Sequence, residues 1–292
     1  MNRIAVLLAV LSAPVTLWAQ SPDVAPFVEL RPSWQVRSTK KSLFQWYDLS
    51  GHYSIVGFRM ILENGLRVYV AQRFQRVDNT GDPDTLDEYY VENRGRWRLG
   101  KQYLPFGRRE ILRTTALAAR LDTNLLLDQA PLTVAYTDAG SGRTRGVIGR
   151  IGGVVAVSVA FGHNFGIQAT DLASFRNLED APGIGRGHRL LLGADTQFRF
   201  AGLQWTADWM SMRQGETPLD GDKDLSTVKM RFVIPDASYP GNLSWSRDWG
   251  ERKDYISLDF ELKGNDKISY IPMVRLEGLA FRDFALTAVV RF

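Results

Sequence analysis

The sequence contains no cysteine in its 292 residues and only three histidines. A chain without cysteine forms no disulfide, so its stability must come from a core or from a closed sheet. No Cys/His cluster has the spacing of a zinc site, and we expect no metal and no cofactor. The net charge of +4 is small and gives no indication of a nucleic-acid partner.

Long apolar runs are also absent after the first nineteen residues. Met1-Asn2-Arg3 is a short basic start, and the apolar stretch from Ile4 ends in small residues at Ala19, as in a secretory signal peptide. We therefore predict a signal peptide over residues 1–19 and one exported domain over residues 20–292. No later window of about eighteen residues is apolar enough for a membrane helix. If this chain enters a membrane it must do so as a barrel, because only helices and closed barrels satisfy every backbone group there.

What the chain does have is alternation with a period of two. Its last nine residues place Phe284, Leu286, Ala288, Val290 and Phe292 on one face, as in a β-strand. This ending resembles the terminal strand of bacterial outer-membrane β-barrels, which serves as the signal for the barrel-assembly machinery. We expect this face to meet lipid, and the strand to pair with Phe27–Arg37 and Ile268–Leu276.

Hairpins recur along the chain. Asn64-Gly65 separates two alternating runs, and further tight turns are expected at Arg94-Gly95, Gly152-Gly153 and Ala201-Gly202. The pattern predicts an all-β, transmembrane antiparallel β-barrel of about fourteen strands, with twelve to sixteen within the range of the method. Short turns alternate with longer connections such as Ser38–Tyr53, which places both termini in the periplasm. A soluble β-sandwich is the competing architecture, but aromatics near strand ends and charged opposite faces favour the barrel.

The faces opposite the apolar ones would line the lumen, and basic residues outnumber acidic ones on them. Rings of Arg and Lys pass anions, because a low-dielectric wall focuses their field on the aqueous path. The alternative interpretation is that these charges form cross-strand ion pairs that only keep the lumen wet. The pore-lining residues expected on strands are Arg59, Arg67, Arg73, Arg96, Arg98, Arg150, Arg199, Lys229 and Arg231.

Two segments resemble the phosphate-selective porin (O and P) family. Glu88–Gly107 contains the phrase Gly-Lys-Gln-Tyr-Leu-Pro-Phe-Gly, and Gly142–Gly152 is similar to that family's Gly-Arg-x-x-Gly-Val strand. The resemblance implies that Leu104–Arg143 is a third extracellular loop, folded into the lumen as a constriction. Thr114–Leu127 would form a short helix within it. The constriction residues would be Arg108, Arg109, Arg113 and Arg120, opposed by Glu110, Asp122 and Asp128.

The sequence thus predicts an outer-membrane porin, a passive diffusion channel with a preference for small anionic solutes, phosphate among them. Its partners would be outer-membrane lipid and lipopolysaccharide, and the resemblance implies a homotrimer. The first alternative is a non-conducting structural or adhesin-type barrel. The second is a barrel hydrolase using His163 or His188, although no nucleophile motif accompanies either histidine. We therefore expect no enzymatic activity.

Overall fold

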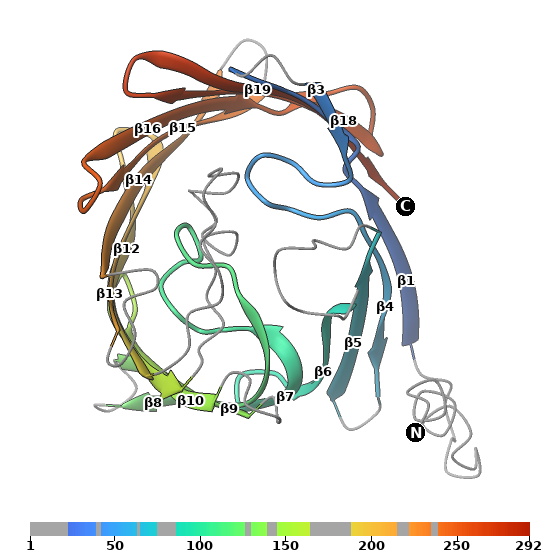
Figure 1. Cartoon of the computed structure of the whole chain (residues 1–292). Helices are drawn as coiled ribbons and strands as arrows, with labels where there is room; N and C mark the ends of the chain where they lie inside the picture. Colours follow the sequence, from blue (N-terminus) through green and yellow to red (C-terminus); the bar gives the residue numbers. More distant parts are fainter. Residues whose placement is uncertain are drawn as a thin grey trace.

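The chain forms a closed antiparallel β-barrel in the computed structural model (Figure 1). The structure describes residues 23–38, 42–62, 65–74, 86–125, 130–138, 145–163, 188–214, 222–234 and 239–292. The expected signal peptide, residues 1–19, lies outside these ranges. Within them, no helix is long and apolar enough to cross a membrane.

Nineteen strand segments make up the sheet, and three pairs of them are consecutive halves of one interrupted strand, which gives sixteen barrel strands. The interrupted strands are β1/β2, β3/β4 and β16/β17. The segments are β1 (Asp23–Leu30), β2 (Ser33–Arg37), β3 (Ser42–Gln45), β4 (Ile55–Ile61), β5 (Leu66–Arg73), β6 (Leu86–Asn93), β7 (Trp97–Tyr103), β8 (Thr115–Leu125), β9 (Ala130–Asp138), β10 (Arg145–Gly152), β11 (Val155–His163), β12 (His188–Phe200), β13 (Leu203–Gln214), β14 (Lys223–Ile234), β15 (Tyr239–Asp248), β16 (Lys253–Phe260), β17 (Leu262–Lys263), β18 (Ile268–Glu277) and β19 (Ala280–Arg291).

Each strand pairs with its neighbour in sequence, and the two ends of the chain close the ring. On one side β19 pairs with β18; on the other it pairs with β2 through Ala285↔Gln35 and with β1 through Val290↔Leu30. Val28 and Phe292 exchange two backbone hydrogen bonds of 3.1 and 2.9 Å. The expected seam is therefore confirmed. We call the end of the barrel at which β1 begins and β19 ends the terminal end.

The expected count of fourteen strands is wrong, because two more strands form inside the stretch predicted as the Leu104–Arg143 loop. These are β8 and β9, which pair with each other and with β7 and β10. Along β8, Ala116 and Ala118 are buried while Leu117 and Leu121 are exposed, which is a strand's alternation. The helix expected over Thr114–Leu127 does not form, because the helix propensity of Ala and Leu is a weak preference that sheet pairing overrides.

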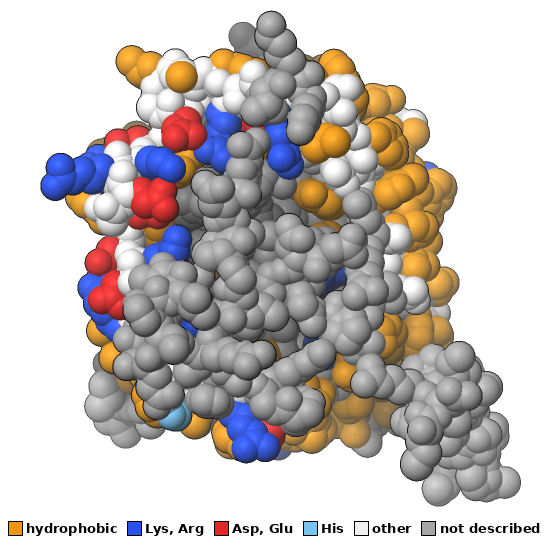
Figure 2. Space-filling model, in the orientation of Figure 1, with side chains coloured by type: hydrophobic (Ala, Val, Ile, Leu, Met, Phe, Trp, Pro, Cys, Tyr) orange, Lys and Arg blue, Asp and Glu red, His pale blue; other side chains and the backbone are white. Residues whose placement is uncertain are grey.

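The expected division between an apolar outer face and a polar lumen is seen most clearly on β11. Val155, Val157 and Val159 are exposed on the outside, whereas Ala156 and Ser158 are buried on the inside. In Figure 2 hydrophobic side chains cover the right-hand outer flank, whereas most of the visible Lys, Arg, Asp and Glu lie on the left and along the rim. Such an outer surface suits hydrocarbon rather than water.

The predicted hairpins at Arg94-Gly95, Gly152-Gly153 and Ala201-Gly202 are confirmed as β6–β7, β10–β11 and β12–β13. The β12–β13 turn has φ of 51° at Ala201 and 76° at Gly202. Positive φ at both central residues gives the turn the twist of the flanking strands, and glycine adopts it without strain.

Candidate functional site: a constriction between two inward segments

The segment from residue 104 to residue 114 leaves β7, turns into the barrel and returns to β8 (Figure 1, green). Its apolar side packs on the inner wall: Phe106 is 2% exposed and clusters with Leu191 and Met210. Gly193 provides the space for the ring, since a Cβ there would lie 2.7 Å from Phe106 Cζ. Burying an aromatic ring fixes the segment against the wall. We call residues 104–114 the constriction loop.

Buried carboxylates hold the polar side of the constriction loop. Asp208 accepts backbone N–H bonds from Arg108, Glu110 and Ile111. Arg108 Nε lies 2.9 Å from Asp195 Oδ1, an oxygen that Arg150 also reaches at 2.6 Å. Ion pairs at these distances attract strongly where both groups are shielded from water. Much of the charge of Arg108 is therefore used in anchoring the loop.

A second inward segment interrupts the strand formed by β3 and β4. Residues 46–54 form a small hairpin, closed by a 2.7 Å bond from Ser54 N to Trp46 O. Leu49 at its tip is 1% exposed and packs on Met273 of β18 and Ala285 of β19. The expected surface connection Ser38–Tyr53 is wrong here, because these residues form β3 and then this inward hairpin. We call residues 46–54 the inner hairpin.

Two arginines from the wall hold the inner hairpin in place. Arg31 NH1 donates to Asp48 Oδ2 at 2.8 Å, and Arg275 NH2 donates to the carbonyl of Leu49 at 3.1 Å. Burial opposes ionisation of Asp48, but hydrogen bonds from His52 and the positive charge of Arg31 outweigh it and hold the pKa of Asp48 well below its usual range. Asp48 is thus a fixed anion.

Between the two inward segments lies a polar space of about 90 Å³. Five basic and two acidic residues line it, together with His52, Met273 and serines of the hairpin and wall. Lys229 Nζ lies 3.4 Å from Glu110 Oε2, so one pair is partly neutralised. The space keeps a positive excess. The basic residues are Arg108, Arg109, Arg113, Lys229 and Arg275, and the acidic ones are Glu110 and Asp259.

Desolvation shifts the pKa of one group in each inward segment, His52 and Arg109. Burial lowers the pKa of His52, and nearby Arg113 and Arg31 lower it further, with Asp48 opposing. Burial also lowers the pKa of Arg109, against the attraction of Glu88. A histidine whose pKa lies below its usual value is neutral at pH 7. The positive field of the constriction therefore comes from arginine and lysine.

The constriction gathers four of the predicted pore residues, Arg108, Arg109, Arg113 and Lys229. Others are held in ion pairs along the wall, with closest N···O distances of 2.7 Å for Arg98–Glu92 and 2.8 Å for Arg120–Asp122. The remaining predicted residues are spread over other elements. Arg59 lies on β4, Arg67 and Arg73 on β5, Arg150 on β10, Arg199 on β12 and Arg231 on β14, while Arg96 lies in the turn between β6 and β7, and Asp128 is outside the described residues.

Sequence reasoning did not assign Arg275 or His52 to the constriction. Arg275 is 3% exposed on β18, and it meets the site only because the inner hairpin reaches across to it. His52 is carried into the lumen by that same hairpin. No local pattern distinguishes an inward hairpin from a surface loop, so the sequence offers no signal for either residue.

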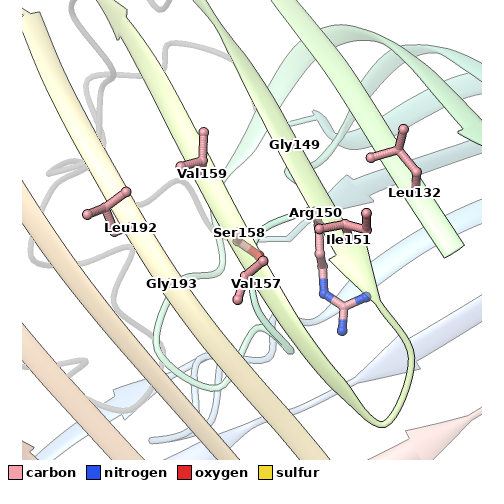
Figure 3. Close-up of a pocket in the computed structure, with 9 residues that line it drawn as sticks. All are labelled: Leu132, Gly149, Arg150, Ile151, Val157, Ser158, Val159, Leu192 and Gly193. Atoms are coloured by element: carbon pink, nitrogen blue, oxygen red, sulfur yellow. The ribbon is translucent and has the colours of Figure 1, made fainter. Parts of the chain in front are cut away.

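A larger hollow of about 400 Å³ lies on the outside of the barrel and is not part of the passage (Figure 3). It surrounds Gly149, where an added Cβ would meet no heavy atom within 4 Å. Outward side chains of Ile151, Val157 and Leu192 border it. It is a depression in the lipid-facing surface.

The described residues hold no group of three or more His, Cys, Asp or Glu that could bind a metal. His52 Nδ1 lies 3.1 Å from Asp48, which is the histidine–carboxylate half of a hydrolase triad. The hydroxyl of nearby Ser50 does not complete it, because that hydroxyl donates to the sulfur of Met273 at 3.7 Å. His188 stacks on Phe161 with ring centroids 5.8 Å apart. The side chain of His163 is not among the described side chains. The absence of enzymatic activity stays a prediction.

Several solved structures are similar to this chain over almost the whole barrel. An outer-membrane protein of Vibrio cholerae, OmpT with loop L8 deleted, has a TM-score of 0.61 at 12% identity, covering 94% of this chain and 100% of that one. The in-vitro folded, trimeric form of OmpT has a TM-score of 0.60 at 8% identity with the same coverage. An anion-selective porin from Comamonas acidovorans has a TM-score of 0.54 at 11% identity, covering 93% and 99%.

No family model and no curated protein matches the sequence. The structural neighbours define the class: the chain has the porin-type fold of bacterial outer-membrane β-barrels. Identities this low establish the fold alone.

Proposed function

We propose that this protein is an outer-membrane porin that passes small hydrophilic solutes down their gradients and prefers anions. The observation that carries the proposal is the constriction, where five basic side chains face two acidic ones across a space of about 90 Å³. A low-dielectric protein wall strengthens such a field for a solute that passes this level. The porin-type fold and the apolar outer face support an outer-membrane location.

Reversal potentials of the purified protein in planar bilayers under a KCl gradient test the proposal. The wild type should prefer chloride over potassium. Changing Arg109 and Arg113 together to Gln should lower the chloride-to-potassium permeability ratio about threefold or more, because two fixed charges leave the constriction. Arg108→Gln should lower it less, because Asp195 already balances that guanidinium.

Arg96→Gln is the control, since it removes one positive charge, as Arg108→Gln does, but from an exposed turn. A wild-type preference for potassium would contradict the proposal. An equal effect of Arg96→Gln and the constriction variants would also contradict it, because the field would then not arise at the constriction.

Phosphate preference, homotrimer formation and contacts with lipopolysaccharide and the assembly machinery are finer parts of the same proposal. The phosphate hypothesis is supported by the motif resemblance and by the forked geometry of arginine, which suits phosphate oxygens. Phosphate should then reduce the chloride current at lower concentration than sulfate does. The trimeric OmpT structure supports a trimer by analogy of fold.

The second candidate is a non-conducting barrel, and the two inward segments favour it by leaving only a narrow space. Folded protein that shifts its mobility on heating yet gives no single-channel steps would establish this alternative.

A further inference from the structure

Three aromatic rings form a stack on the lumen wall, away from the constriction. Phe27 of β1 and Tyr69 of β5 have centroids 5.5 Å apart with planes inclined by 16°. Tyr69 and Tyr90 of β6 lie 5.1 Å apart at 22°. Nearly parallel rings at these separations overlap with an offset, and the half-burial of the three side chains leaves part of each exposed. We call Phe27, Tyr69 and Tyr90 the aromatic strip.

The backbone is arranged to place these rings together. Phe27 pairs with Gly57 on the intervening strand β4, and a Cβ on Gly57 would lie 2.8 Å from Phe27 Cζ. The missing side chain lets the phenyl ring lean across β4 toward Tyr69. Tyr69 and Tyr90 are directly opposed in the β5–β6 register. All three side chains are half-buried on a wall that is otherwise polar.

A cation is located at the strip. Arg59 of β4 lies directly opposite Tyr69, and its Cζ is 5.2 Å from the ring centroid of Phe27 and 5.8 Å from that of Tyr69. Arg59 is exposed, and it forms no ion pair with a carboxylate of the described residues. Arg98 also lies over Tyr90, with its Cζ 4.0 Å from the ring centroid. The guanidinium of Arg98, however, donates two hydrogen bonds to Glu92. Arg59 is therefore the cation that remains open to a solute.

Aromatic faces and an open guanidinium recognise different parts of a solute. A flat apolar ring gains by stacking on the strip, and a carboxylate gains from Arg59. A small aliphatic anion engages only the charge. A neutral ring engages only the strip. None of the three rings lines the constriction, so the strip adds a second step to the passage.

We propose that the aromatic strip and Arg59 form a binding site for small aromatic carboxylates on their way through the channel. The ring of the solute would pack against the lumen-exposed parts of Tyr69 and Tyr90 while its carboxylate meets Arg59. This inference rests on the proposed function, because it requires an open passage that admits anions. Stacking of this kind corresponds to about a three- to tenfold difference in affinity.

Block of the chloride current in planar bilayers by benzoate, acetate and benzyl alcohol tests the site. For the wild type, benzoate should give half-block at a concentration about three- to tenfold below that of acetate. Tyr69→Leu and, separately, Tyr90→Leu should bring benzoate close to acetate while leaving acetate unchanged. Two separate variants guard against one that fails to fold, which heat-modifiable mobility reveals.

Arg59→Gln should weaken block by benzoate, and Arg231→Gln is its matched control. Arg231 on β14 is also exposed and faces the lumen. Like Arg59, it lies near the terminal end of the barrel. Equal block by benzoate and acetate, equal block by benzyl alcohol and benzoate, or equal effects of the two arginine variants would each overturn the inference. A wild-type preference for potassium would instead overturn the proposed function, and reversal potentials report this separately.

Discussion

At the scale of the residue, Asp195 connects the wall to the constriction loop. It is 3% exposed on β12 and faces two guanidinium groups, Arg150 from the neighbouring wall and Arg108 from the loop. A buried anion with two cations is stable only while both remain close, because removing one partner leaves uncompensated charge. The positive potential available to a solute is the part that Asp195 does not cancel.

Asp195→Asn should therefore lower the stability of the barrel and raise its preference for anions. Loss of the carboxylate leaves two guanidinium groups without their partner and should destabilise the barrel by roughly 2–3 kcal/mol. The same change adds net positive charge and should raise the chloride-to-potassium permeability ratio. Thermal unfolding in detergent and reversal potentials measure the two effects.

The control is Asp138→Asn, which breaks an exposed pair with Arg145 whose side chains are 41% and 58% exposed. Exposed pairs contribute little, so both measurements should stay near the wild type. If Asp195→Asn lowered the chloride-to-potassium permeability ratio, Asp195 could not be the group that offsets the positive charge of Arg108.

At the scale of the element, the constriction loop depends on one aromatic anchor. Phe106 fits the space left by Gly193 and is surrounded by buried side chains of the inner wall. The loop has no regular structure of its own, so its position follows from this contact, from Asp208 and from the pair of Arg108 with Asp195.

Phe106→Ala should release the loop from the wall. The lost burial should cost about 3 kcal/mol in the free energy of unfolding, as for other large-to-small core changes. Single-channel conductance should rise and the open current should become noisier, because the loop no longer holds one position. Phe44→Ala, a change at an outward ring that is 61% exposed, is the control. Unchanged conductance in Phe106→Ala would show that this ring does not position the loop.

The sequence predicted the strands correctly wherever apolar and polar residues alternate clearly. The prediction failed at β8. The hairpins at Arg94-Gly95 and Ala201-Gly202 follow from local turn chemistry, which the sequence carries directly. Thr114–Leu127 is rich in Ala and Leu, whose helix preference is weak and is overridden by pairing with β7 and β9. The constriction arginines Arg108, Arg109 and Arg113 were found through a motif, whereas Arg275 depends on a contact that no local pattern encodes.

At the scale of the whole molecule, the barrel is completed by a contact between residues far apart in the chain. β2 pairs with β19, and Trp34 lies directly opposite Leu286. Both side chains point outward and are 48% and 42% exposed. Period-two alternation predicted these faces, because it is a local property of each strand.

Because the chain contains no cysteine, an engineered pair reports closure directly. Trp34→Cys with Leu286→Cys should form an intramolecular disulfide on oxidation, since directly opposed residues have Cα atoms about 4.5–5.5 Å apart. The linked protein should show altered mobility after denaturation until it is reduced. Trp34→Cys with Leu243→Cys, on non-adjacent β15, should give no such species. A cross-link in the second pair but not in the first would contradict the closure.

The inner hairpin is an insertion within a strand, and this has a consequence for how the passage can be resized. Both of its ends continue into hydrogen-bonded sheet, and Ser54 N bonds to Trp46 O at its base. Any change in its length must be absorbed by the barrel wall. The constriction loop connects two complete strands, so its length can change while the sheet stays intact. One border of the aperture is therefore set by the barrel, and new solute preferences can arise by altering the other border alone.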